Sequence, residues 1–320
     1  MSLIFIQIAS YRDPELVPTI KDCIAKAKLP DNLRFAICRQ YHPDDEFDNV
    51  DEYRFDPHFQ IIDIPYQKAK GVCVARRALQ TLYNDEEYYL QLDSHHRFTK
   101  DWDTNLIKQI KSLQRKGHKK PLLTAYLPSY EPDNDPAGRA NKPWELKFDR
   151  FLPQGPAMPK PETMDDFKKL RSPIQASLYS AHFVFTIGKW CKEVVYDSEL
   201  YFHGEEISLA IRSYTHGYDL FHPHKIFAWH YYTRKDQPRH WADVDLWEKK
   251  NNNSHAKYRR LVGIDSDDTE TLTCGLGTER TLEQYIKYSG IDVTKKEVHN
   301  KALSGMRLPL KYKSKKEYTT

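Results

Sequence analysis

The chain has 320 residues, 39% of them hydrophobic and 29% charged, and its formal net charge is +4. This length and composition provide a core for one large domain or two small ones. They exclude a membrane-spanning protein, because no apolar run approaches the length of a bilayer crossing. The weak net charge gives no reason to expect a nucleic-acid partner.

Five scattered cysteines without a C-x-x-C pair argue for reduced thiols and against a zinc ribbon. We therefore expect a cytoplasmic protein. The N-terminal segment carries no basic residues before its apolar run, so it predicts a first strand rather than a signal peptide.

Strand and helix patterns alternate along the first 127 residues. The predicted strands cover residues 3–9, 33–38, 59–64, 88–92 and 122–127. Between them, helical spacing of apolar residues predicts helices from residue 14, at 71–83 and at 102–113. This alternation predicts an α/β fold with a mostly parallel sheet flanked by helices.

The pattern breaks at residues 129–172, which are rich in proline, charge and aromatics without clear periodicity. A segment of this length predicts a binding loop or lid on the acceptor side of a site. Later segments predict an extended stretch, two short strands and several helices. We divide the chain into a main domain, 1–265, and a helical and basic C-terminal extension, 266–320.

One strand ends in a notable triplet, Asp93-Ser94-His95. Side chains two positions apart in a strand point the same way, so Asp93 and His95 form half of a metal site. A carboxylate and an imidazole suit Mn²⁺ or a similar divalent ion. The alternative is a loop with a capping aspartate before the next helix.

His230, at the end of a late strand, is a candidate third ligand; the alternative is a buried core histidine. Polar residues at the ends of the first two strands and at the start of the second helix offer donors for a nucleotide diphosphate. They are Ser10, Arg12, Asp13, Arg39, Arg76 and Arg77. Each arginine taken alone is equally compatible with a surface ion pair.

Two acidic residues, Glu205 and Glu206, follow Gly204 at a predicted helix start. They have a structural explanation, because acidic side chains stabilise a helix N-terminus. They also have a functional one, in which a carboxylate orients a sugar hydroxyl or the incoming acceptor.

These motifs together resemble glycosyltransferase family 60, the polypeptide α-N-acetylglucosaminyltransferases that modify hydroxyproline on cytoplasmic proteins, and their bacterial relatives. The resemblance covers most of residues 3–265. It rests on the segments 8–13, 71–77, 90–95, 204–208, 215–219 and 229–230. The family is similar in turn to the mucin-type polypeptide N-acetylgalactosaminyltransferases, whose D-x-H motif and distant histidine hold Mn²⁺ against a UDP-sugar.

The resemblance implies a GT-A fold, retention of anomeric configuration, a UDP-sugar donor, most simply UDP-GlcNAc, and Mn²⁺ or Mg²⁺. It implies metal binding by Asp93, His95 and His230. It places the nucleotide and diphosphate at Ser10, Arg12, Asp13, Arg39, Arg76, Gln91, Arg234 and Arg239. It implies catalytic positions for Glu205, Glu206 and Asp93, with Glu206 standing where the relatives carry Asn.

The resemblance leaves the acceptor open, as a hydroxyl on a protein or on a surface-polysaccharide precursor. A catalytically silent UDP-sugar-binding or glycan-binding module is the alternative function. A two-metal phosphoesterase is a third, but the sequence lacks a second ligand cluster. The basic C-terminal segment offers a peripheral contact with a membrane surface, or a solvated tail.

Overall fold

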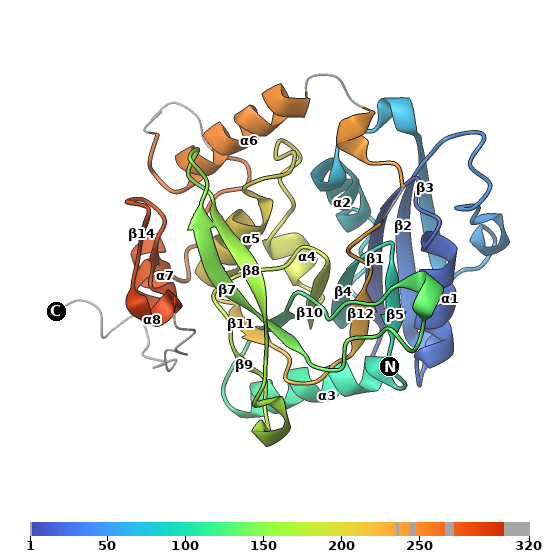
Figure 1. The fold of residues 1–320 in the computed structure, drawn as a ribbon, viewed down its shortest axis with the longest axis horizontal. Coiled ribbons are helices and arrows are strands. Elements are labelled where there is room, and N and C mark those ends of the chain that lie inside the picture. The colour runs from blue at the N-terminus through green and yellow to red at the C-terminus, as the bar shows by residue number, and fades with distance from the viewer. Residues whose placement is uncertain (1, 235–236, 244–246, 266–271, 304–320) are drawn as a thin grey trace.

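An eight-stranded sheet runs through the middle of the molecule (Figure 1). The computed structural model describes residues 2–234, 237–243, 247–265 and 272–303. Its strand order is β3-β2-β1-β4-β10-β6-β11-β9. Strands β3, β2, β1 and β4 are parallel to one another, as are β6 and β11, whereas β10 and β9 run antiparallel to their neighbours. The expected α/β architecture with a mostly parallel sheet is therefore confirmed.

The elements follow the predicted alternation closely in the first half. The strands are β1 (Ile4–Tyr11), β2 (Leu33–Tyr41), β3 (Phe59–Pro65), β4 (Tyr88–Asp93), β5 (His96–Phe98), β6 (Pro121–Thr124), β7 (Trp144–Phe151), β8 (Ala157–Thr163), β9 (Ile174–Gln175), β10 (Phe183–Ile187), β11 (Asp219–His222), β12 (Ala228–His230), β13 (Ile291–Asp292) and β14 (Glu297–Val298). The helices are α1 (Leu16–Lys26), α2 (Val72–Gln80), α3 (Trp102–Arg115), α4 (Trp190–Glu193), α5 (Glu205–Thr215), α6 (Trp247–Leu261), α7 (Leu282–Ser289) and α8 (Asn300–Leu303).

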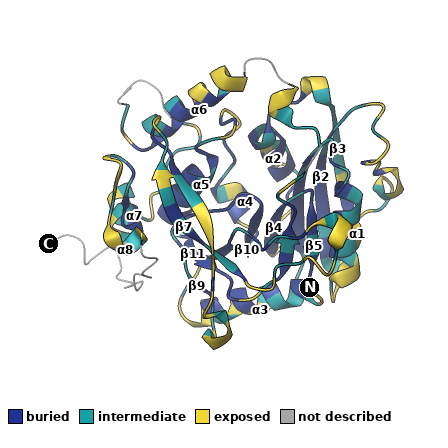
Figure 2. Cartoon of the chain, in the orientation of Figure 1, coloured by how far each residue is buried: buried dark blue, intermediate teal, exposed yellow. Residues whose placement is uncertain are grey.

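Helices cover both faces of the sheet because its strand side chains alternate between two hydrophobic cores. In β1, Phe5 lies in one core, whereas Ile6 and Ile8 lie in the other. Helices α1 and α3 pack on the face of Ile6 and Ile8. Helices α2, α4, α5 and α7 contribute to the opposite core. Buried central strands and partly exposed outer helices are visible in Figure 2.

A short ladder beside the main sheet joins distant parts of the chain. After β4 the chain turns at Ser94 and continues as β5, which pairs antiparallel with β12. In this register His230 lies opposite His96. The pairing explains how a residue late in the sequence reaches the carboxyl end of β4.

The segment 129–172 is more ordered than its composition suggested. It contains the antiparallel hairpin of β7 and β8, which crosses in front of the sheet in Figure 1. The sequence pattern did not predict β8, because it contains prolines at positions 159 and 161 and proline is depleted from central strands. The expectation of an irregular segment was therefore wrong for the hairpin.

The C-terminal elements extend the same core. Helix α7 buries Tyr285 completely, and its hydroxyl donates to the carbonyl of Ser177 at 2.7 Å. The basic residues from 304 onward lie outside the described residues. None of the described helices combines the length and apolar character that a membrane crossing requires.

Gly188, which directly follows β10, is the most closely packed glycine among the described residues and yields a prediction about stability. A methyl group there would lie 2.0 Å from the carbonyl oxygen of Glu86, beside the strands β10 and β4. We expect Gly188→Ala to destabilise the protein by about 3 kcal/mol, the upper range for overpacking. Thermal unfolding measures this, with Gly275→Ala as the control, because a methyl group there meets its nearest atom at 3.5 Å. Equal melting temperatures for the two variants would contradict this packing.

Candidate functional site

The three predicted metal ligands converge at the carboxyl end of β4. Asp93 Oδ2 lies 3.8 Å from His95 Nε2 and 3.5 Å from His230 Nε2. One potential ligand atom from each residue lies within 4.8 Å of the others. The structure therefore assembles from three separate positions the group that the D-x-H motif and the late histidine suggested.

The chemistry of this group suits a divalent cation. Burial lowers the pKa of His230 well below its usual value, so the ring is neutral and has a lone pair. Burial alone would raise the pKa of Asp93, but the positive charge of Arg76, 2.6 Å away, holds it well below its usual range. Neither ring nitrogen of His230 makes a hydrogen bond to the described residues. Two imidazoles and an ionised carboxylate are ligands suited to Mn²⁺, so the residues fit a bound metal.

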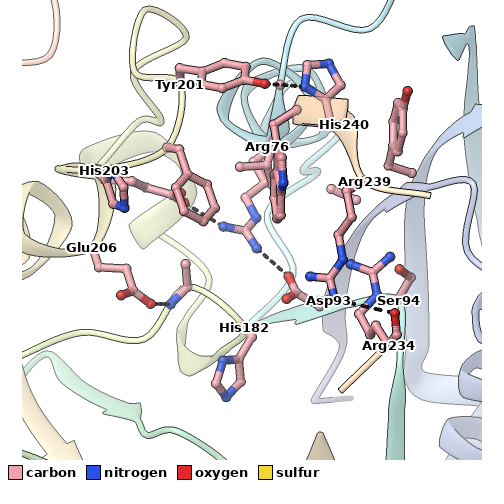
Figure 3. A pocket seen from close by; sticks show the side chains of 18 of the residues that line it. Arg76, Asp93, Ser94, His182, Tyr201, His203, Glu206, Arg234, Arg239 and His240 are labelled. Atoms are coloured by element: carbon pink, nitrogen blue, oxygen red, sulfur yellow. Dashed lines mark hydrogen bonds and ion pairs between the residues drawn. The ribbon is translucent and has the colours of Figure 1, made fainter. Parts of the chain in front are cut away.

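Arg76 joins this group to the start of α5. The side chain is 3% exposed, and its two terminal nitrogens each lie 2.6 Å from a carboxylate, Asp93 Oδ1 and Glu205 Oε1. Both terminal amino groups of Arg76 are thus paired with carboxylates, and Figure 3 shows the pair with Asp93. The geometry supports a role in orienting Asp93 and Glu205.

Glu206 lies on the other side of the same helix start, tied to a different strand. Its Oε1 accepts the backbone N–H of Ala181 at 2.8 Å, and its Oε2 lies 3.0 Å from the hydroxyl of Tyr126. Burial raises the pKa of Glu206 to about 7. Near neutral pH this carboxyl group is therefore protonated in part of the molecules and can then donate a hydrogen bond, as an amide would.

A cavity of about 380 Å³ opens above these residues. Eight of the predicted site residues line it, namely Arg76, Asp93, His95, Glu205, Glu206, His230, Arg234 and Arg239. Figure 3 shows Arg76, Asp93, Arg234 and Arg239 gathered on one side, with Glu206 and His182 nearby. A positively charged wall next to a metal-ligating group is suited to a phosphorylated ligand.

Two of the predicted nucleotide contacts, Arg12 and Arg39, point to carboxylates instead of the cavity. Arg12 Nε lies 2.7 Å from Asp45, and Nη1 lies 3.4 Å from Asp243. Arg39 Nε lies 2.9 Å from Asp63. Neither arginine lines the cavity.

Ser10 and Gln91 are buried below the cavity and do not line it. The carbonyl of Ser10 accepts a hydrogen bond from Gln40 at 3.1 Å. Gln91 accepts from the hydroxyl of Tyr89 at 2.7 Å and donates to the carbonyl of Ala181. Asp13 is likewise buried and does not line the cavity.

The sequence did not single out the aromatic and histidine residues that form much of the cavity wall. They are Tyr11, Tyr126, His182, Tyr201, Phe202, His203, Tyr232, His240 and Trp241. The His240 ring makes a hydrogen bond of 2.7 Å with the hydroxyl of Tyr201. Several of them directly precede Gly204 or follow His230, so their position beside a motif could have identified them.

Two solved structures superpose on this fold. GalNAc-T7, in a structure with UDP, GalNAc and Mn²⁺, superposes with a TM-score of 0.61 at 11% identity. The match covers 92% of this chain but only 58% of GalNAc-T7. Residues 1–349 of TarS from S. aureus, in complex with UDP-GlcNAc, superpose with a TM-score of 0.51 at 13% identity, covering 84% of this chain and 68% of the other. At these identities the likeness shows the fold, that of the GT-A glycosyltransferases.

Sequence comparison is more specific. No curated protein sequence matches the chain. The family model Glycosyltransferase (GlcNAc) matches residues 3–54 and 44–295, most of the chain and all elements of the candidate site. This protein therefore belongs to the Glycosyltransferase (GlcNAc) family.

Proposed function

We propose that this protein is a metal-dependent, retaining glycosyltransferase that moves GlcNAc from UDP-GlcNAc to a hydroxyl group on a protein or a surface-polysaccharide precursor. The observation that carries the proposal is the cluster of Asp93, His95 and His230 beside two cavity-lining arginines. The ligands of the two similar structures, UDP with GalNAc and Mn²⁺ in one and UDP-GlcNAc in the other, support the same donor class. The motifs shared with glycosyltransferase family 60 support a polypeptide acceptor, and the free cysteines support a cytoplasmic location.

In this proposal Asp93, His95 and His230 hold the cation, with Mn²⁺ preferred over Mg²⁺ because two ligands are imidazoles. A bound divalent cation supplies positive charge that stabilises the departing UDP. Arg234 and Arg239 contact the diphosphate directly. Arg12, Arg39, Ser10, Asp13 and Gln91 support the nucleotide end of the cavity from behind its surface.

The opposite end of the cavity receives the sugar and the acceptor. Glu205, held by Arg76, orients a sugar hydroxyl or the acceptor. Glu206, fixed by Ala181 and Tyr126, presents a polar group close by. Because Arg76 already engages Glu205 at 2.6 Å, this carboxylate is poorly suited to act as a nucleophile. The acceptor hydroxyl then attacks C1 on the face of the sugar from which UDP leaves. The bond between C1 and the phosphate oxygen breaks, and the hydroxyl proton passes to the β-phosphate of the departing UDP.

The donor is tested by calorimetric titration of UDP-GlcNAc, UDP-GalNAc, UDP-Glc and UDP-Gal, with and without Mn²⁺. We expect UDP-GlcNAc to bind most tightly, and Mn²⁺ to increase its affinity. Asp93→Ala should abolish transfer and the metal-dependent part of binding, since one of three ligands is lost. Failure of every donor to bind under both conditions would refute the nucleotide-sugar site, and an Asp93→Ala variant with normal activity would refute the metal site.

The two arginines 39 and 239 form a matched pair for testing the diphosphate contact. We expect Arg239→Gln to weaken UDP binding about tenfold or more, the value of a charge-assisted hydrogen bond, and to leave uridine binding unchanged. Arg39→Gln should lower the melting temperature but spare UDP affinity, because this side chain pairs with Asp63 outside the cavity. The reverse pattern, with Arg39 needed for UDP, would contradict the assignment.

The raised pKa of Glu206 predicts a pH-dependent stability. The pKa of Glu206 in the folded protein is about 7, above the ordinary 4.5. The stabilisation of the folded state by protonated Glu206 is therefore complete below about pH 4.5 and is lost as pH rises through 7. Glu206→Gln keeps the hydrogen bonds of the protonated form and does not titrate. We expect the variant to gain about 2 kcal/mol relative to wild type between pH 5 and pH 8. Denaturant unfolding at both values measures this, and a constant difference would show that Glu206 is ionised throughout.

A further inference from the structure

Asp13 occupies an unusual place for a residue expected to contact a nucleotide. It follows the end of β1, where Arg12 adopts a backbone φ of +46°. This turn directs Asp13 inward, and its side chain is 0% exposed. One oxygen, Oδ1, accepts the backbone N–H of Glu15 at 3.0 Å, which fixes the orientation of the carboxylate.

The other oxygen faces the metal-binding group. Asp13 Oδ2 accepts the hydroxyl hydrogen of Ser94 at 2.6 Å and lies 2.7 Å from His95 Nδ1. An ionised carboxylate can only accept, so the neutral His95 ring must carry its proton on Nδ1. Nε2, which points to Asp93, is then left with the free lone pair that a metal needs.

His230 differs from His95 in this respect. Neither of its ring nitrogens has a hydrogen-bond partner among the described residues. Its ring is placed by packing, 4.2 Å from the ring of His182 between centroids. Of the two proposed histidine ligands, His95 is therefore the one whose tautomer is set by a hydrogen bond to a carboxylate.

A cation also lies on the far side of the same oxygen. Arg234 Nη2 is 3.4 Å from Asp13 Oδ2. Arg234 follows β12 and lines the cavity, so Asp13 links the strand end that carries His95 to the segment that carries His230. The guanidinium of Arg234 thereby balances the negative charge of the buried Asp13 carboxylate, and no bound ligand is needed for this.

We propose that Asp13 is a positioning residue for the metal: it holds His95 in the Nδ1–H tautomer and does not touch the nucleotide. This inference rests on the proposed function. Carboxylates that accept the second N–H of a metal-ligating histidine commonly contribute 10- to 100-fold to metal affinity.

The variant Asp13→Asn tests the inference because a neutral amide replaces the ionised carboxylate. With the amide oxygen toward the N–H of Glu15, the amide nitrogen donates to His95 Nδ1 and moves the ring proton to Nε2, the atom that should bind metal. With the amide reversed, its neutral oxygen accepts the Nδ1 proton more weakly than a carboxylate does, and its nitrogen faces the N–H of Glu15. We expect Mn²⁺ alone, titrated by calorimetry, to bind Asp13→Asn about 10- to 100-fold more weakly than wild type.

Two controls separate this effect from general damage. Asp103→Asn alters another buried carboxylate, one that accepts the backbone N–H groups of Lys28 and Leu29, and should leave Mn²⁺ affinity unchanged. Ser94→Ala removes a hydrogen bond to the same Asp13 oxygen but keeps the contact with His95, so its effect should be small. Metal-free UDP binding should be equal in wild type and Asp13→Asn.

Nitrogen-15 NMR of the histidine rings in metal-free wild type gives a readout that needs no variant to fold. We expect His95 as the Nδ1–H tautomer. An Nε2–H tautomer overturns the inference, as does equal Mn²⁺ affinity of wild type and Asp13→Asn. Loss of metal-free UDP binding in Asp13→Asn also overturns it, by making Asp13 a nucleotide contact. A wild-type protein that binds neither Mn²⁺ nor UDP refutes the proposed function itself.

Discussion

The geometry of the site depends on one buried guanidinium. Arg76 lies between Asp93 at the end of β4 and Glu205 at the start of α5, and all three belong to different elements. A buried cation is tolerated only with well-placed anions, and removing one partner leaves an uncompensated charge. The same requirement that stabilises the interior therefore fixes the distance between Asp93, in the proposed metal site, and the carboxylate at the helix start.

Histidine rings pack closely against one another at the proposed metal site. The His230 ring lies 4.6 Å from that of His95 and 5.0 Å from that of His96, between centroids. Burial lowers the pKa values of His96, His182 and His230 well below the usual value. Neutral rings can pack this closely without mutual repulsion. The two interpretations of His230, core residue and ligand, are thus compatible.

The sequence predicted the fold, and it named eight residues that the structure gathers around one cavity, because both depend on local patterns. Alternating strand and helix segments indicated the sheet, and the D-x-H motif indicated its functional edge. The antiparallel direction of β10 depends on long-range pairing, for which periodicity carries no signal. The β7–β8 hairpin is a local pairing, but the prolines of β8 are atypical of a strand. Resemblance to a family, rather than spacing, brought His230 into the ligand set.

Single residues at strand ends were harder to predict than segments. Ala9 and Tyr11 line the cavity while Ser10 between them is buried, and Gln40 lines it while Arg39 does not. Side chains alternate between the two faces of a strand, so adjacent residues have opposite environments. A motif places the correct strand end at the site, but only the register and twist of the sheet decide which of two neighbours faces the ligand.

The pairing of β5 with β12 also has a consequence for how the protein is made. Residues 93–95 leave the ribosome long before residue 230, yet β5 acquires its partner strand only when β12 arrives. A chain interrupted anywhere between them carries an Asp-x-His pair with no third ligand. Ligands that bind the native state alone stabilise it by mass action. Any stabilisation by cation or donor therefore begins only after β12 has been synthesised and has docked, so truncated products gain none of it.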